Sequence, residues 1–388
     1  MNFMLITDTF PPLINGVSRT LQILAAGLAN AGHRVEVVTT VDGGCQNPAV
    51  QVTTVPSIPL PGYQGIRLGL TTSGFMKRRM KAMKPDGVYV AVESLMGAAA
   101  VNAARKLGIR FVTGFHTNFH SYMSDYRVGM LSSVAERYLR WFHSRAARTL
   151  VPSSTVAENL RQMGIRRINV MGRGVDSALF HPSKRNHELR ASIGATDQTP
   201  VALYAGRVAA EKNLELAISS FLSIRRTNPA ARCVFAGDGP RVPELSAKYP
   251  EFHFVGACGD DLLSRWYASA DVFVFPSLTE TYGNVVAEAM ASGLVVVAFA
   301  YAAAQKLIRH HETGFLAPFG DQETFLCHVT SALNHWHNQE MRGAARHAVE
   351  PLGWQEIILQ FERELLGDLE SVPFGKESLQ SQLAPAHA

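Results

Sequence analysis

Two glutamates flank a glycine loop in FPSLTETYGNVVAEAMASGLVVVAF, residues 275–299. Glu280 follows an apolar run that stops at Pro276, and Glu288 lies in a segment of helical spacing that begins near Asn284. Backbone N–H groups at the start of a helix favour anions, whereas carboxylates accept hydrogen bonds from hydroxyl groups. The arrangement predicts a binding site with a sugar on one side, a ribose on the other, and a diphosphate between the two. The alternative is an exposed loop acid and an ordinary first-turn helix acid.

Two cations follow another apolar run, in PVALYAGRVAAEKNLE, residues 200–215. Arg207 comes directly after the run, and Lys212 follows five positions later. Positive side chains near the carboxyl end of a strand suit a diphosphate. The alternative, two solvated surface charges with Glu211 as a partner, stays open.

A third strand-to-helix transition lies near the N-terminus, in TDTFPPLINGVSRT, residues 7–20. The apolar strand ends at Asp8, the loop carries Gly16, and a helix begins near Ser18. Glycine allows the backbone to approach a phosphate closely, and a helix N-terminus adds N–H donors. Taken alone, the same pattern also fits a simple turn.

The elements that must position these residues alternate between strands and helices, which is typical of doubly wound parallel sheets. The strand-like segments are residues 2–7, 33–40, 87–92, 109–116, 147–154, 200–206, 231–239, 252–257, 271–277 and 294–299. Polar residues 181–200 indicate a domain junction. We therefore predict an α/β protein with domains at 1–181 and 182–352, a helix at 353–370 and a disordered tail at 371–388.

Composition separates the two halves of the 388-residue chain. Residues 1–180 carry 20 basic and 9 acidic side chains, whereas the remainder carries 17 and 23. The basic first half predicts an anionic partner. The longest apolar run, residues 294–304, is too short to span a bilayer, which takes roughly 20 residues. The four scattered cysteines predict neither disulfides nor a zinc site, so we expect a cytoplasmic location.

The combination of GRVAAEKN and PSLTETYGNVVAEAMASG resembles the signature of family-4 retaining glycosyltransferases, with seven residues between two glutamates. TDTFPPLINGVS is similar to the family's N-terminal phosphate loop, GFHTNF to its acceptor-side histidine segment, and GRGVDSALFHP to the segment closing the first domain. The segment YASADVFVFPS also matches. The similarity covers residues 3 to about 366 and points to the branch containing sulfoquinovosyl-diacylglycerol synthases and lipid mannosyltransferases.

This resemblance implies the GT-B fold, in which two Rossmann-like domains face a central cleft and a C-terminal helix packs back on the first domain. It also implies four catalytic residues. Arg207 and Lys212 would hold the donor diphosphate and stabilise its charge as it leaves, and Glu280 would hold hydroxyls of the donor sugar. His116 would line the cleft near the sugar and the acceptor.

Other residues would contact the donor only. The resemblance implies that Glu288 binds the ribose and that Gly16 approaches the distal phosphate from the first domain. Val255 and Gly256 would lie near the nucleobase. The helix-opening residues would assist through their backbones, and these are Tyr282, Gly283, Asn284 and Val285. The chain departs from related sequences at Ala300, where an acid is common, and in its N-terminal loop, whose glycines are reduced to Asn15–Gly16.

The expected chemistry needs fixed positive charge. Breaking a glycosidic bond to a diphosphate builds oxocarbenium character on the sugar and negative charge on the leaving group. The sequence has no D-x-D motif, and Arg207, Lys212 and a helix N-terminus can supply the stabilisation instead. We therefore expect no metal and no cofactor beyond the nucleotide-sugar co-substrate. The family implies retention, in which the departing phosphate accepts the acceptor's proton.

Other functions fit the same pattern less well. A sugar-nucleotide epimerase would bind a similar donor without an acceptor site, and a non-catalytic sugar-nucleotide-binding protein would follow if Ala300 removed activity. A dinucleotide oxidoreductase is disfavoured because no G-x-G-x-x-G follows a strand. We expect no nucleic-acid partner.

The acceptor side carries basic residues mixed with apolar ones, in FMKRRMKAMKPD (75–86) and ERYLRWFHSRAAR (136–148). Such segments suit an anionic membrane surface. We expect a peripheral enzyme at the inner face of the cytoplasmic membrane, with a lipid acceptor preferred over a soluble sugar or a polysaccharide precursor. The alternative is a solvated helix face whose methionines are buried in the core. The donor, a UDP-sugar or GDP-mannose, stays open.

Overall fold

The computed structural model divides into two compact units, and it describes all residues except 14, 42–44, 46, 61–66, 117–128 and 368–388. The described residues of unit 1 fall within Met1–His116, Val128–Gly172 and Ile358–Ala388, and those of unit 2 within Arg173–Ile357. The predicted tail at 371–388 lies outside the described residues. The predicted domain limits stay predictions.

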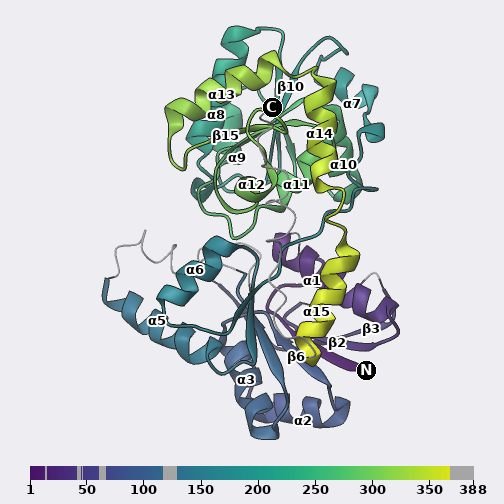
Figure 1. Ribbon diagram of the computed structural model, residues 1–388, viewed down its shortest axis with the longest axis vertical. Helices are drawn as coiled ribbons and strands as arrows, with labels where there is room; N and C mark the ends of the chain where they lie inside the picture. Colours follow the sequence, from purple (N-terminus) through teal and green to yellow (C-terminus); the bar gives the residue numbers. More distant parts are fainter. Residues whose placement is uncertain (14, 42–44, 46, 61–66, 117–128, 368–388) are drawn as a thin grey trace, which may run out of the picture. The chain divides into compact units, whose positions relative to one another are not determined.

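Unit 1 contains a parallel sheet with the strand order β3-β2-β1-β6-β7-β8-β9 in the described residues (Figure 1). Its strands are β1 (Asn2–Ile6), β2 (Arg34–Thr39), β3 (Val50–Thr54), β6 (Gly87–Val90), β7 (Phe111–Gly114), β8 (Arg148–Val151) and β9 (Ile168–Val170). The short strands β4 (Ser57–Pro59) and β5 (Arg67–Gly69) pair antiparallel. The helices are α1 (Gly16–Asn30), α2 (Ser73–Met83), α3 (Leu95–Leu107), α5 (Gly129–His143) and α6 (Ser154–Gln162).

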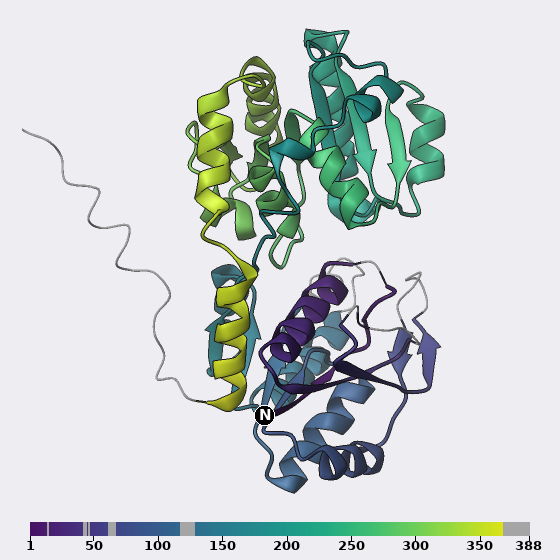
Figure 2. The ribbon, with the colours of Figure 1, turned by 90° about the vertical axis from the view of Figure 1, so that its right-hand side faces the viewer.

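Alternate residues of the unit 1 strands face opposite helix layers, because side chains alternate along a strand. Met4 of β1 packs in one cluster with Met76 and Met80 of α2. On the opposite face, the Phe3 ring meets His33 edge-on, with a centroid distance of 5.1 Å. Figure 2 shows α1 in dark purple on one side of the purple strands and the blue α2 and α3 on the other.

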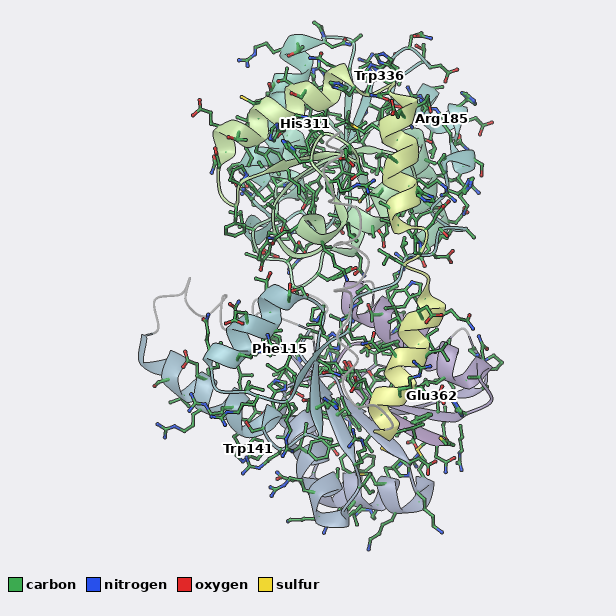
Figure 3. All side chains as sticks on the ribbon, viewed as in Figure 1. Phe115, Trp141, Arg185, His311, Trp336 and Glu362 are labelled. Atoms are coloured by element: carbon green, nitrogen blue, oxygen red, sulfur yellow. The ribbon has the colours of Figure 1, made fainter. Side chains whose placement is uncertain are left out.

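The helix α15 (Trp354–Leu366) begins in unit 2 and ends in unit 1. Its Phe361 ring lies edge-on to Tyr89 of β6, with a centroid distance of 4.9 Å. Glu362, labelled in Figure 3, places Oε1 3.0 Å from His33 Nε2. The predicted return of the C-terminal helix to the first domain is confirmed.

Unit 2 contains a second parallel sheet, with the order β12-β11-β10-β13-β14-β15 in the described residues. Its strands are β10 (Val201–Ala205), β11 (Arg232–Ala236), β12 (His253–Gly256), β13 (Val272–Phe275), β14 (Val295–Phe299) and β15 (Phe315–Ala317). Its helices are η1 (Pro182–Lys184), α7 (His187–Ser192), η2 (Ala210–Lys212), α8 (Leu214–Thr227), α9 (Val242–Lys248), α10 (Asp260–Ser269), α11 (Asn284–Ala291), α12 (Ala302–Leu307), α13 (Gln322–Asn334) and α14 (Gln339–Val349).

The unit 2 sheet is also covered on both faces. Leu203 and Phe273 pack in one cluster with Trp266 of α10, whereas Tyr204 packs on the other face with Phe221 of α8. Figure 1 shows α8 and α13 on one side of this unit and α10 and α14 on the other. Strands buried on both faces read as continuous apolar runs, which is why VALYA and VVVAF were recognisable in the sequence.

The predicted fold class, two doubly wound α/β domains, is confirmed by these two sheets. Five of the described strands were not predicted from the sequence, namely β3, β4, β5, β9 and β15. All of them except β3 have only three residues, and β3 and β4 contain polar residues. The four cysteines are free. In the parts that the structure describes, no helix has the length and apolar character that crossing a bilayer requires.

Candidate functional site

The sheet of unit 2 changes its direction of growth between β10 and β13. β11 and β12 extend the sheet on one side of this pair, and β14 and β15 extend it on the other. The carboxyl ends of strands at such a switch point are the usual ligand position in open parallel sheets. Arg207 and Lys212 follow β10, and Glu280 follows β13. The structure thus brings three of the four predicted catalytic residues to one place.

Lys212 and Glu280 form an ion pair across this switch point. Lys212 Nζ lies 2.5 Å from Glu280 Oε1, and both side chains are largely buried. Ser277 Oγ donates to the same carboxylate oxygen at 2.8 Å, and Asn213 Nδ2 donates to the Pro276 carbonyl at 3.1 Å. This ion pair and these hydrogen bonds hold the loops after β10 and β13 together, and they keep a cation and a carboxylate in contact.

Arg207 has a different partner. Its Nη1 lies 3.4 Å from Glu211 Oε1, and its side chain is 38% exposed. The surface-charge alternative expected Glu211 to be the partner of the two cations. Glu211 does pair with Arg207, whereas Lys212 pairs with Glu280. A guanidinium has five N–H donors, so Arg207 can contact both a carboxylate and a phosphate.

The loop before α11 presents its backbone rather than its side chains. Tyr282 is buried, its hydroxyl donates to the Arg173 carbonyl at 3.3 Å, and burial raises the pKa of that hydroxyl. Gly283 has φ of +90°, which favours glycine. No side chain caps α11 among the described residues, and the helix begins at Asn284 and Val285. Ligand contacts of this loop would therefore fall to N–H groups, as predicted.

Glu288 is not an exposed helix acid, because only 7% of its surface is accessible. The hydroxyl of the fully buried Tyr267 donates to Glu288 Oε2 at 3.2 Å. Burying a carboxylate costs free energy unless hydrogen bonds compensate for the lost water, and the Tyr267 hydroxyl supplies such a bond to Glu288. The first-turn alternative is thereby excluded, while the ribose role stays a prediction.

Val255 and Gly256 lie at the end of β12, an edge strand. Gly256 has φ of +73°, and its carbonyl accepts from Gly237 N–H at 2.8 Å. Both residues lie at the carboxyl ends of the strands, as the switch point does. In the sheet, β11 and β10 lie between β12 and β13. Ala300 follows β14 and offers no polar side chain, and its N–H donates to the Ala317 carbonyl.

Gly16 is the first residue of α1 in unit 1. Asn15 caps this helix, and its Oδ1 accepts from the N–H groups of Val17 and Ser18 at 3.1 and 2.8 Å. The reduced loop Asn15–Gly16 thus uses its asparagine to satisfy two first-turn donors. The predicted contact with a phosphate would therefore be made by the backbone of Gly16.

His116 follows β7 and is nearly fully buried in unit 1. Its Nε2 lies 2.7 Å from the hydroxyl of Tyr89 on β6. His116 belongs to unit 1, whereas Arg207, Lys212 and Glu280 belong to unit 2. Its predicted role near the sugar and the acceptor stays a prediction.

A buried acidic pair that the sequence analysis did not assign lies at the switch point of unit 1, between β1 and β6. Asp8 accepts from Gly69 N–H at 3.0 Å, and burial raises the pKa of Asp8 to about 6, with a smaller contribution from Glu93. Glu93 Oε1 lies 3.3 Å from Nε2 of the buried His143. Each acid closely follows one of the two central strands, β1 and β6. Recognising the pair from the sequence would require the order of the strands in the sheet, which a single sequence does not give.

Within the described ranges, no group of three or more His, Cys, Asp or Glu side chains is placed to hold a metal ion. Positive charge at the unit 2 switch point comes from Arg207 and Lys212.

Family models match most of the chain. The model described as Glycosyltransferase Family 4 matches residues 14–179, and the model described as Glycosyl transferases group 1 matches residues 199–335.

Two curated relatives align over nearly the whole chain. A GDP-mannose-dependent alpha-mannosyltransferase from Mycobacterium tuberculosis is 34% identical, over 95% of this chain and 96% of that protein. The sulfoquinovosyl transferase SQD2 from Arabidopsis thaliana is 32% identical, over 90% of this chain and 70% of that protein. The branch indicated by the sequence motifs is confirmed by these two relatives.

A solved structure confirms the fold. Sucrose-phosphate synthase from Thermosynechococcus elongatus superimposes with a TM-score of 0.78 at 19% identity, over 93% of this chain and 97% of that chain. The two sheets described above therefore have the GT-B architecture.

Proposed function

Since the chain belongs to glycosyltransferase family 4, we propose that it is a retaining hexosyltransferase that moves a hexose from a nucleotide sugar to a lipid hydroxyl. The observation that carries this proposal is the meeting of Arg207, Lys212 and Glu280 at the β10/β13 switch point. Cations beside a carboxylate suit a diphosphate next to a sugar hydroxyl.

The donor would occupy this switch point through its diphosphate. An ammonium has three N–H donors, so Lys212 can keep its contact with Glu280 while it donates to a phosphate oxygen. Arg207 would add a second cation, and the uncapped start of α11 would add N–H groups. These groups are fixed before the reaction, so they stabilise the leaving diphosphate without reorganisation.

Glu280 would accept hydrogen bonds from hydroxyls of the donor sugar. Its position beside Lys212 keeps the carboxylate in contact with a cation, which favours the ionised, accepting form. We assign no carboxylate nucleophile. In the retaining route, the departing phosphate takes the proton of the acceptor hydroxyl, and the new bond forms on the face that the phosphate leaves.

The transfer would proceed without a metal. Metal ions in other transferases neutralise the diphosphate charge, and here Arg207 and Lys212 would carry that task. The donor base would lie along the sheet edge toward Val255 and Gly256. The GDP-mannose-dependent relative makes GDP-mannose the first donor to test, and UDP-sugars are the alternative that the sequence left open.

A lipid acceptor at an anionic membrane fits the charge on α2. Met76, Met80 and Met83 point into the core, as the alternative interpretation expected, whereas Arg78 and Lys81 are exposed. Arg79 is not exposed in the same way, because its side chain pairs with the buried Glu36.

The second basic segment, on α5, is also partly structural. Trp141, labelled in Figure 3, stacks on Tyr138 with a centroid distance of 5.7 Å, and the Arg145 guanidinium lies 4.6 Å from the Trp141 centroid. Arg140 Nε donates to the Met163 carbonyl. Membrane contact is therefore proposed mainly for α2, at the inner face of the cytoplasmic membrane.

The function is tested by a panel of donors and acceptors. UDP-glucose, UDP-galactose and GDP-mannose are each incubated with diacylglycerol vesicles, with a glycolipid extract and with soluble sugars. We expect one donor to give a lipid product whose anomeric configuration, read by NMR, equals that of the donor. An inverted product, or donor turnover without transfer to any acceptor, would contradict the proposal.

A further inference from the structure

We propose that Tyr89 is a positioning residue that fixes the ring of His116 for the acceptor side of the transfer. The proposal rests on the proposed function for its kinetic consequence. Its structural part concerns unit 1 alone and has a readout of its own.

The contact between Tyr89 and His116 is short and buried. The Tyr89 hydroxyl lies 2.7 Å from His116 Nε2, and the two rings meet edge-on at a centroid distance of 6.0 Å. Tyr89 is fully buried, and His116 is 6% exposed. In such a place, a lost hydrogen bond leaves a polar group without water to replace it, so the pairing is strongly preferred over alternatives.

Gly114 provides the room in which this hydrogen bond forms. A Cβ atom at Gly114 would lie 2.0 Å from the Tyr89 hydroxyl oxygen and 2.6 Å from His116 Nε2. Both distances are far below van der Waals contact. A side chain at Gly114 and the Tyr89–His116 contact therefore exclude each other, and the glycine is explained by the contact.

Tyr89 is itself held on three sides. Its backbone lies in the middle strand β6, where Tyr89 pairs with Leu5 of β1 and with Val112 of β7. The ring of Phe361 on α15 packs edge-on against the Tyr89 ring at 4.9 Å. The position of the hydroxyl is consequently fixed, and it can hold the ring of His116, which follows the neighbouring strand β7.

A histidine whose Nε2 is engaged in this way has a set ring orientation. The contact suits either neutral tautomer, because a tyrosine hydroxyl can both donate and accept. Positioning of this kind lowers the reorganisation needed for reaction. Tyr89 would thus act through His116 and would not touch the substrate.

The kinetic test compares Tyr89→Phe with Tyr138→Phe. Tyr138 is a matched control because its hydroxyl also makes a 2.7 Å hydrogen bond in unit 1, to the Glu93 carbonyl. For Tyr89→Phe we expect kcat/KM for the acceptor to fall about tenfold, the value of one lost hydrogen bond, with the donor Kd unchanged. The pH–rate profile should move in Tyr89→Phe and stay in place in Tyr138→Phe. Equal profiles for Tyr89→Phe and wild type would overturn the proposal.

A spectroscopic test does not depend on transfer. Protein labelled with ¹⁵N-histidine gives the Nδ1 and Nε2 chemical shifts of each ring, and the His116→Gln variant identifies the His116 signals. We expect the same His116 Nε2 shift in the wild type and in Tyr138→Phe, and a different shift in Tyr89→Phe and in Gly114→Ala, where the hydrogen bond is lost. The same Nε2 shift in all four proteins would overturn the proposal even if the enzyme is active. A changed shift in these two variants, together with no glycosyl transfer by the wild type, would uphold the positioning and reject the proposed function.

Discussion

Lys212 and Glu280 contact each other within the site that is proposed to hold a diphosphate and a sugar hydroxyl. At the scale of single residues, this pair explains how a carboxylate can lie beside a bound diphosphate without repelling it. Arg207 would add a second cation and is itself paired with Glu211. Both cations were predicted to hold the diphosphate and to stabilise its charge as it leaves, and each of them has a carboxylate partner in the structure.

Replacing Arg207 or Lys212 by Ala should lower the rate of transfer by at least roughly 100-fold, comparable to losing one preorganised stabilising group. Steady-state rates measure this directly. Arg241→Ala is the matched control, because Arg241 is a paired arginine of the same unit, bonded to Glu215 and Glu244 on α8 and α9. Near-normal transfer by either site variant would remove the phosphate assignment.

Asp8 should make the stability of unit 1 depend on pH. Because burial raises its folded pKa to about 6, the protonated form is favoured on folding, and stability should fall as pH rises from about 4 through about 6. The cost at pH 7.5 is about 3 kcal/mol. Asp8→Asn should therefore be more stable than wild type in urea at pH 7.5 and nearly equal to it at pH 4. The same difference at both pH values would contradict this environment for Asp8.

At the scale of elements, α2 shows how one helix combines packing and charge. Its methionines at positions 76, 80 and 83 face the core, so its cations must lie on the remaining faces. Arg79 reaches across to Glu36 and Thr53 on the adjacent strands β2 and β3. Only the other basic residues of α2 are available to a membrane surface.

The triple variant Lys77→Gln, Arg78→Gln, Lys81→Gln should weaken binding to anionic vesicles by up to roughly 100-fold, since each charge contributes about 1 kcal/mol near such a surface. Arg79→Gln should mainly lower stability, because it leaves buried Glu36 without its ion-pair partner. Co-sedimentation at low and high salt, beside donor titration, measures both effects. Equal sedimentation of the triple variant and wild type would rule out α2 as the anchor and favour a soluble acceptor.

The elements also show what a single sequence can predict. The central strands were recognisable because burial on both faces makes them continuous apolar runs, and Glu280 and Arg207 were found because they follow such runs. The Lys212–Glu280 pair, the Asp8–Glu93 pair and the role of Tyr89 were not predictable. Each depends on which strands are neighbours, and that order is set by packing between segments far apart in the chain.

At the scale of the whole molecule, the two halves of the chain differ in charge, and the acidic half contains the residues that are proposed to bind an anionic donor. Net charge therefore does not locate the donor site. The local field of Arg207, Lys212 and the start of α11 would locate the donor in the proposed site, because nearby charges outweigh distant, screened ones. The basic first half remains suited to an anionic surface.

We expect the whole protein to work without a bound metal. Transfer should persist in excess EDTA, because the diphosphate charge is met by Arg207 and Lys212. The assay compares initial rates before chelation, in EDTA, and after adding Mg²⁺ or Mn²⁺. Loss of activity in EDTA that either ion restores would show that a metal neutralises the donor instead.

The affinity of a nucleoside diphosphate for the switch point of unit 2 tests the donor site most directly, and it is measured by calorimetric titration of UDP and GDP into the full chain. We expect saturable binding of one of them, a Kd at least about tenfold weaker in Arg207→Ala, and an unchanged Kd in Arg241→Ala. Equal affinity in Arg207→Ala and wild type, or no binding of either nucleotide to wild type, would contradict the placement of the donor diphosphate between β10 and β13.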